Sequence, residues 1–96
     1  MSYQFLAEAL EEFDNAAARY EHQRPGLGAE FVQAVDSAIG RLIAHPESWP
    51  IIDARFRRCP VAVFPYDVVF GVRDGGVLIF AIAHHHRKPD FWLSRK

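Results

Sequence analysis

Residues 55–92, RFRRCPVAVFPYDVVFGVRDGGVLIFAIAHHHRKPDFW, contain three candidate β-strands in succession. The first is a basic-to-apolar run, Arg55–Val63. The second, Tyr66–Arg73, places large apolar side chains at every other position, which is the period of a strand. Asp74–Gly76 tolerates positive φ and predicts a tight reversal of the chain. Val77–Ala83 then runs back with scarcely a polar atom, as expected of a strand that is covered on both faces.

Two helices are predicted ahead of these strands. Ala7–Gln23 carries apolar side chains three and four residues apart and acids in its first half, and Gly28–Ala44 carries a longer apolar stripe. The Pro and Gly residues within 24–28 end the first helix and turn the chain. His45–Pro46 ends the second, because a residue before proline is pushed out of the α region. Two helices joined by a short turn form an antiparallel hairpin that must bury its apolar faces against the sheet.

The predicted fold class is therefore α+β, in one domain that spans residues 1–96. A helical hairpin at about residues 7–44 packs on an antiparallel sheet at about residues 55–84. The sheet has three strands, or four if Tyr3–Leu6 contributes a short one. Trp49–Ile52 is the predicted crossing loop between the helices and the sheet.

Composition restricts the class of protein. The chain has 96 residues, half of them hydrophobic, which predicts a small folded domain rather than disorder. No apolar run approaches the ~20 residues of a membrane span, and the acidic, Ala-rich start differs from the basic start of a signal peptide. Cys59 is the single cysteine. An internal disulfide is therefore excluded, and the cytoplasm is the expected location.

A net charge of −1 hides an asymmetry between the two halves of the chain. Residues 1–50 carry three Arg against eight acids, whereas residues 51–96 carry eight Arg or Lys against four acids. Either the second half faces an anionic partner, or the two sets of charges simply lie on different surfaces. The chain ends in a basic-aromatic tail, residues 85–96. Its Phe91 and Trp92 either anchor an interface or fold back over the core.

Three consecutive histidines, His84, His85 and His86, follow the last predicted strand. Histidine titrates close to neutral pH and can act as an acid or a base. Alternation along a strand places His84 and His86 on one side and His85 on the other. Since the three cannot converge and no Cys pair is present, no metal site is predicted. No cofactor is predicted either.

Several short motifs stand in order along the chain. They are Tyr20-Glu21, Arg24-Pro25-Gly26-Leu27-Gly28 with Phe31, His45-Pro46 with Trp49-Pro50, Arg57-Arg58, Phe64-Pro65-Tyr66, Val68–Val72 and His84-x-x-Arg87-x-Pro89-x-x-Trp92. In this order and spacing the chain resembles the RelE/ParE superfamily of toxins from type II toxin–antitoxin systems. The resemblance covers nearly the whole chain and is strongest to the ParE, or plasmid-stabilisation, branch. It implies a helical hairpin packed on a twisted antiparallel sheet, and a cognate antitoxin encoded next to the toxin.

The resemblance implies one of two targets. RelE-like members cut messenger RNA on the ribosome, whereas characterised ParE-like members poison DNA gyrase without cutting nucleic acid. RNA cleavage needs a base, an acid and positive charge at the phosphate, for which Arg58, His84 and Arg87 are the catalytic candidates. Against cleavage, the chain as a whole is not basic, and Asp67 follows Tyr66 where RelE-like nucleases commonly carry Arg. Gyrase inhibition is the favoured hypothesis, an endoribonuclease is the alternative, and an inactive toxin-like binding module is the second alternative.

A gyrase inhibitor needs an interaction surface rather than a catalytic group. The candidate target-binding residues are Arg57, Arg87, Lys88, Trp92 and Arg95. The family's antitoxins have a mostly disordered tail that folds over the toxin, along the helical hairpin and an exposed strand edge. The candidate antitoxin-binding residues are Phe13, Tyr20, Phe31, Arg57 and Arg58. The basic second half predicts an acidic antitoxin tail, and we expect an oligomer with the antitoxin and no membrane partner.

Overall fold

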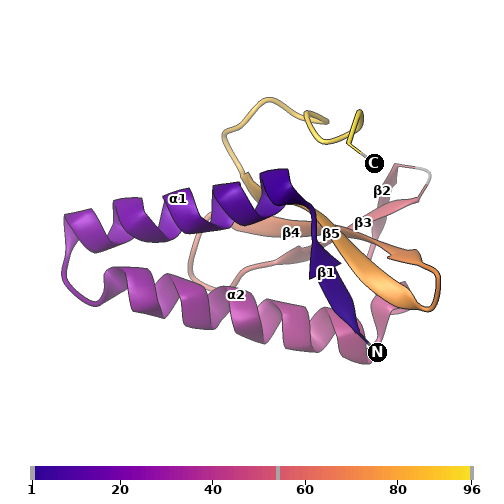
Figure 1. Cartoon of the computed structure of the whole chain (residues 1–96), viewed down its shortest axis with the longest axis horizontal. Helices are drawn as coiled ribbons and strands as arrows, with labels where there is room; N and C mark the ends of the chain where they lie inside the picture. Colours follow the sequence, from indigo (N-terminus) through magenta and orange to yellow (C-terminus); the bar gives the residue numbers. More distant parts are fainter. Residues whose placement is uncertain (1, 54, 96) are drawn as a thin grey trace.

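The structure, a computed structural model, describes residues 2–53 and 55–95. The elements in chain order are β1 (Tyr3–Phe5), α1 (Ala7–Gln23), α2 (Leu27–Ala44), the 3-10 helix η1 (Pro46–Ser48), β2 (Ile51–Asp53), β3 (Phe56–Pro60), β4 (Tyr66–Arg73) and β5 (Gly76–His84). The five strands form one sheet in the order β1-β5-β4-β3-β2. Only the β1–β5 pair among the described strands is parallel. Figure 1 shows α1 and α2 running antiparallel along the sheet, with the segment after β5 returning over it.

The predicted α+β class, a helical hairpin on a sheet, is confirmed. The possible fourth strand at the N-terminus is present, since Tyr3–Phe5 pairs with β5. The strand count is corrected to five because Ile51–Asp53, whose first two residues were predicted to lie in the crossing loop Trp49–Ile52, pairs with β3. Both added strands have three residues. Three residues are too few to show a period of two, so only pairing with a neighbour identifies such strands.

The turn between α1 and α2 explains the motif from Glu21 to Gly28. Both oxygens of the Glu21 carboxylate accept the N–H of Gly26, at 3.1 and 3.0 Å, and Oε1 also accepts the N–H of Gly28 at 3.0 Å. These N–H groups belong to the start of α2, where backbone donors have no partner within the helix. Gly26 has φ 91°, and a Cβ on Gly28 would lie 2.7 Å from the Ala17 carbonyl oxygen. The two glycines therefore permit the sharp turn and the close contact of the two helices.

The β4–β5 hairpin closes as predicted. Asp74 and Gly75 have φ of 52° and 75°, and Arg73 pairs with Gly76. Two central residues with positive φ match the twist of the flanking strands. Further along, the register shifts between Val69 and Phe70, so that one extra residue of β5 has no counterpart in β4.

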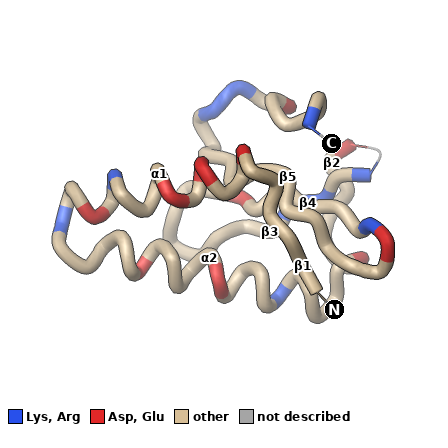
Figure 2. Tube along the Cα trace, in the orientation of Figure 1, with Lys and Arg blue, Asp and Glu red and all other residues tan. Residues whose placement is uncertain are grey.

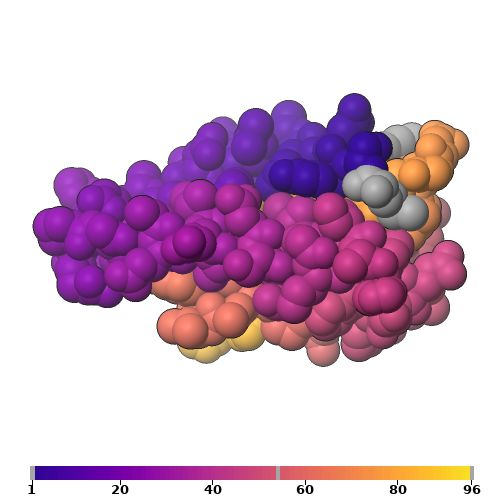
Figure 3. Space-filling model, turned by 90° about the horizontal axis from the view of Figure 1, so that it is seen from below, coloured from indigo at the N-terminus to yellow at the C-terminus, as the bar shows by residue number. Residues whose placement is uncertain are grey.

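The sheet is buried on both faces. On the hairpin side, Phe31, Val35 and Leu42 of α2 pack with Val68, Phe70 and Ile79 of the sheet. Seen from below, α2 fills the front of the molecule, with the N-terminal residues on one side of it and residues of the sheet on the other (Figure 3). The opposite face carries Phe56, Val69, Phe80, Ala81 and Ala83, which pack with Trp92 from the segment after β5. The apolar composition of β5 thus reflects burial on two sides, and Trp92 folds back over the core.

Candidate functional site

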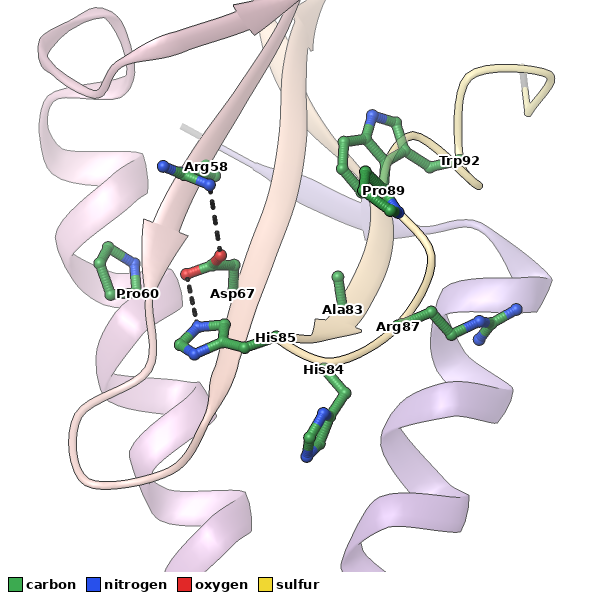
Figure 4. Close-up of a pocket in the computed structure, with 9 residues that line it drawn as sticks. All are labelled: Arg58, Pro60, Asp67, Ala83, His84, His85, Arg87, Pro89 and Trp92. Atoms are coloured by element: carbon green, nitrogen blue, oxygen red, sulfur yellow. Dashed lines mark ion pairs between the residues drawn. The ribbon is translucent and has the colours of Figure 1, made fainter.

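An open cleft of ≈ 470 Å³ lies where the ends of β3, β4 and β5 meet the tail after β5 (Figure 4). Strand pairing builds it, because Asp67 pairs with Pro60 of β3 on one side and with Ala83 of β5 on the other. The neighbouring Tyr66 belongs to the core under the helices. Since successive strand residues alternate, Asp67 points to the opposite face, into the cleft.

Asp67 is the centre of the polar groups in this cleft. Its Oδ1 lies 3.4 Å from Nε2 of His85, and its Oδ2 lies 3.9 Å from Nη1 of Arg58. The Asp67 side chain is only 15% exposed, whereas those of His85 and Arg58 are about half exposed. A backbone hydrogen bond from His85 N–H to the Pro65 carbonyl, 2.9 Å, fixes the turn that carries the imidazole. The arrangement is an imidazole oriented by a carboxylate, which is suited to proton transfer.

His84 lies on the other side of the chain, turned away from Asp67 (Figure 4). Its ring packs edge-on to Tyr66 at 4.9 Å, and its Nδ1 accepts the N–H of His86 at 3.0 Å. Burial lowers the pKa of His84, and the neighbouring His86, His85 and Arg19 lower it further. Alternation correctly predicts that His84 and His86 share one side and His85 takes the other.

Glu12 of α1 ties the tail to the body of the protein. Its carboxylate accepts the N–H of Ile82 at 3.1 Å and both terminal nitrogens of Arg95, at 3.1 and 2.8 Å. It also accepts Nη1 of Arg87 at 3.3 Å. Arg95 in turn donates to the Phe80 carbonyl at 2.8 Å. These bonds occupy backbone groups of β5 beyond the reach of the short β1, and they hold the tail against the sheet.

The predicted catalytic residues Arg58, His84 and Arg87 all line the cleft. Their side chains differ in direction, because Arg87 reaches toward α1 and stacks over the Phe91 ring at 3.9 Å. His85, rather than His84, contacts the carboxylate of the cleft.

The predicted target-binding residues fall into two groups. Arg87 and Lys88 are exposed, whereas Trp92 and the Arg95 side chain are 9% and 13% exposed and hold the tail in place. Arg57 is half-buried and donates to the carbonyl oxygens of Glu47 and Trp49, at 3.2 and 2.7 Å, so it fixes the segment before β2.

The predicted antitoxin-binding residues are also divided. Phe31 is fully buried, and Phe13 and Tyr20 pack against it in tilted orientations, at 6.0 and 5.1 Å between the ring centroids. These three aromatic residues belong to the core between the helices and the sheet. Arg58 is exposed at the cleft, where a partner can reach it.

Sequence analysis missed the Asp67–His85 pair and the Glu12 cluster. The signal for the first was present, since a tight β4–β5 hairpin brings residue 67 close to residues 83–85. Asp67 was nevertheless interpreted only as a departure from a nuclease pattern. Glu12 lies 70 residues from Ile82 and 83 from Arg95 in the chain. No local pattern marks so distant a contact.

Figure 2 shows acids along the helices and a run of Lys and Arg in the loop after β5. Among residues 2–53 and 55–95, no three His, Cys, Asp or Glu side chains are grouped closely enough to hold a metal ion. No helix within these ranges is long and apolar enough to span a bilayer.

Comparison with known proteins shows which family the sequence matches. Residues 3–89 match the family described as the ParE toxin of type II toxin–antitoxin system, parDE. A search of curated proteins finds no match. Among solved structures, a chain of the chromosomal ParDE TA system from P. aeruginosa is similar, with a TM-score of 0.77 and 18% identity. The similarity covers 88% of this chain and 95% of that chain, and at this identity it shows the shared fold.

Proposed function

The chain belongs to the ParE toxin family of type II toxin–antitoxin systems, and on that premise we propose that it is the toxin of a plasmid-stabilisation module. A cognate antitoxin neutralises it, and its target is DNA gyrase in the cytoplasm. The family match over residues 3–89 carries this proposal. The fold shared with a chain of a ParDE system supports it.

The exposed part of the tail is the surface we assign to the target. Arg87 and Lys88 project from the loop after β5, while Trp92 and Arg95 anchor that loop to the sheet. A basic loop held on a rigid support loses little entropy on binding. Arg and aromatic side chains are also frequent anchors of protein interfaces.

The antitoxin is proposed to place an acidic tail over the cleft and Arg58, in one oligomeric complex with the toxin. Charge complementarity with the basic second half of the chain supports this arrangement. The neighbouring small reading frame should encode a partner that co-purifies with this chain and has an acidic C-terminal tail. A basic tail would contradict the electrostatic part of the proposal.

The decisive experiment is a DNA supercoiling assay with purified gyrase. We expect loss of supercoiling, or trapped cleaved DNA, and a weaker effect from the double variant Arg87→Ala, Lys88→Ala. Arg24→Ala is the matched control, because Arg24 is an exposed arginine at the distant α1–α2 turn, paired with Glu30 at 3.6 Å. Undisturbed supercoiling with the unmodified chain would remove gyrase as the target.

One observation favours a second candidate, a ribosome-dependent endoribonuclease. The cleft places the His85 imidazole and the Arg58 guanidinium on the same carboxylate, that of Asp67, which supplies a base and one phosphate contact. Mapping of messenger 5′ ends in a translation extract tests it. New 5′ ends that disappear with His85→Asn would establish the nuclease, whereas intact messages would exclude it.

Growth arrest on expression, relieved by the antitoxin, distinguishes either toxin from an inactive binding module. Normal growth at full expression of folded protein would leave only the binding module.

A further inference from the structure

A second hollow, of ≈ 280 Å³, lies on the far side of His84 from Asp67. Helix α1 forms one wall, and the ends of β4 and β5 with the first tail residues form the other. The polar side chains that line it are Glu12, Asn15, Arg19, Tyr66, His84 and Arg87. None of the functional assignments above uses Arg19 or Tyr66.

Arg19 and Tyr66 present donors that the protein does not use. Nη2 of Arg19 donates to the Tyr66 hydroxyl at 2.7 Å. Because that oxygen accepts from Arg19, its own proton remains to donate. Arg19 is exposed, and no ion pair involves it within the described ranges of the chain. A guanidinium has five N–H donors, so most of those of Arg19 remain for a ligand.

His84 adds a third donor. Its Nδ1 accepts the N–H of His86 at 3.0 Å, which assigns the proton of the neutral imidazole to Nε2. The edge-on contact with the Tyr66 ring, at 4.9 Å, keeps the imidazole beside the Arg19–Tyr66 pair. The lowered pKa of His84, due first to burial and then to His86, His85 and Arg19, maintains the neutral donor form near pH 7.

Glu12 is the acid of this hollow, and its acceptor sites are filled. Its Oε1 accepts from Ile82 and Arg95, and its Oε2 accepts from Arg95 and Arg87. A carboxylate offers about four lone-pair positions, so little capacity remains for the donors of Arg19, Tyr66 or His84. The hollow therefore has an excess of hydrogen-bond donors over acceptors.

We propose that this hollow binds the phosphate group of a nucleotide or of a nucleic-acid strand. A phosphate monoester or diester has three or two free oxygens in tetrahedral array, and Arg19, Tyr66 and His84 line one hollow as neighbours. Arginine matches phosphate geometry with paired N–H bonds, and such charge-assisted bonds are the strong ones. This proposal is independent of whether gyrase or messenger RNA is the target.

The test is a titration of the purified full chain, followed by the NMR signals of the His84 imidazole. The probes are inorganic phosphate, adenosine 5′-monophosphate, a short single-stranded oligonucleotide, and acetate at equal ionic strength. We expect saturable shifts with the phosphate compounds and none with acetate. The tightest of the three phosphate probes identifies the source: free phosphate, nucleotide or strand.

Variants locate the binding. Arg19→Gln should weaken phosphate binding about tenfold or more, and Tyr66→Phe about two- to tenfold, since the first loses charge-assisted bonds and the second a neutral one. Arg19→Lys should restore part of the loss. Arg24→Gln is the matched control, because it removes one exposed arginine at the distant α1–α2 turn.

Three outcomes would overturn the proposal. They are equal response to acetate, absence of saturable shifts with all three phosphate probes, or weakening by Arg24→Gln with Arg19→Gln unchanged. Circular dichroism and the signals of the buried core confirm folding of each variant. The titration measures phosphate binding directly, whereas the supercoiling and 5′-end assays measure action on a target. The two proposals can therefore fail independently of each other.

Discussion

The two faces of the sheet are covered by segments of very different character. The α1–α2 hairpin covers one face with fully buried apolar side chains and a cluster of aromatic rings, and its two helices are in close contact with each other at Gly28. The tail covers the other with Trp92 and with the ion pairs that converge on Glu12. Apolar burial changes little with pH and salt, whereas ion pairs respond to both. The hairpin face is therefore the permanent scaffold, and the tail face is the part that can respond to its surroundings.

The largest effect should come from truncating an aromatic residue on the hairpin face. Phe31→Ala removes a fully buried ring at the centre of the aromatic cluster and should cost about 3–5 kcal/mol of unfolding free energy. Trp92→Ala is its counterpart on the tail face and should cost less. Trp92 packs in the cluster on the opposite face of the sheet from the hairpin, and its Nε1–H is buried with no acceptor among the described residues. Urea unfolding measures both, and equal losses would contradict the division between the two faces.

The hairpin and the tail also differ in how far their structure could be predicted from the sequence. Both helices and the β4–β5 hairpin follow from local patterns, with the bounds of Ala7–Gln23 and Tyr66–Arg73 matching the structure. Their periods of 3.6 and 2 repeat over many residues. β1 and β2 are too short to carry such a pattern. The contacts of Glu12 with the tail join segments over 70 residues apart, so only the folded chain reveals them.

The next effect is release of the tail by Glu12→Gln. The substitution keeps the size of the side chain and removes the charge that Arg95 and Arg87 share. Since the Glu12 and Arg95 side chains are only 15% and 13% exposed, we expect a loss of about 2 kcal/mol. Hydrogen exchange should rise in residues 85–95 and stay low in α2. Glu11→Gln, at an exposed position one residue earlier, is the control and should change neither.

A smaller effect should follow pH through His84, which adjoins the tail. Its pKa in the folded chain is lowered from 6.5, first by burial and then by His86, His85 and Arg19. Below pH 6.5 the unfolded chain therefore binds the proton more readily than the folded one. The contribution of His84 to the free energy of unfolding is therefore fully present above pH 6.5 and is lost as the pH falls through the folded pKa. Unfolding at pH 7.5 and 5 should show a drop that is smaller in His84→Gln, and an identical drop in both would exclude His84 as its source.

The smallest effect on stability, and the sharpest separation of scaffold from function, is expected for Lys88→Ala. Lys88 is exposed, and no hydrogen bond or ion pair involves its side chain within the described residues. Its removal should change the unfolding free energy by no more than about 0.5 kcal/mol. If the exposed tail meets the target, gyrase inhibition should weaken up to about fivefold, as for loss of one exposed charge contact. Unchanged inhibition, in a variant this close to the parent in stability, would move the target surface away from the tail and toward the cleft around Asp67.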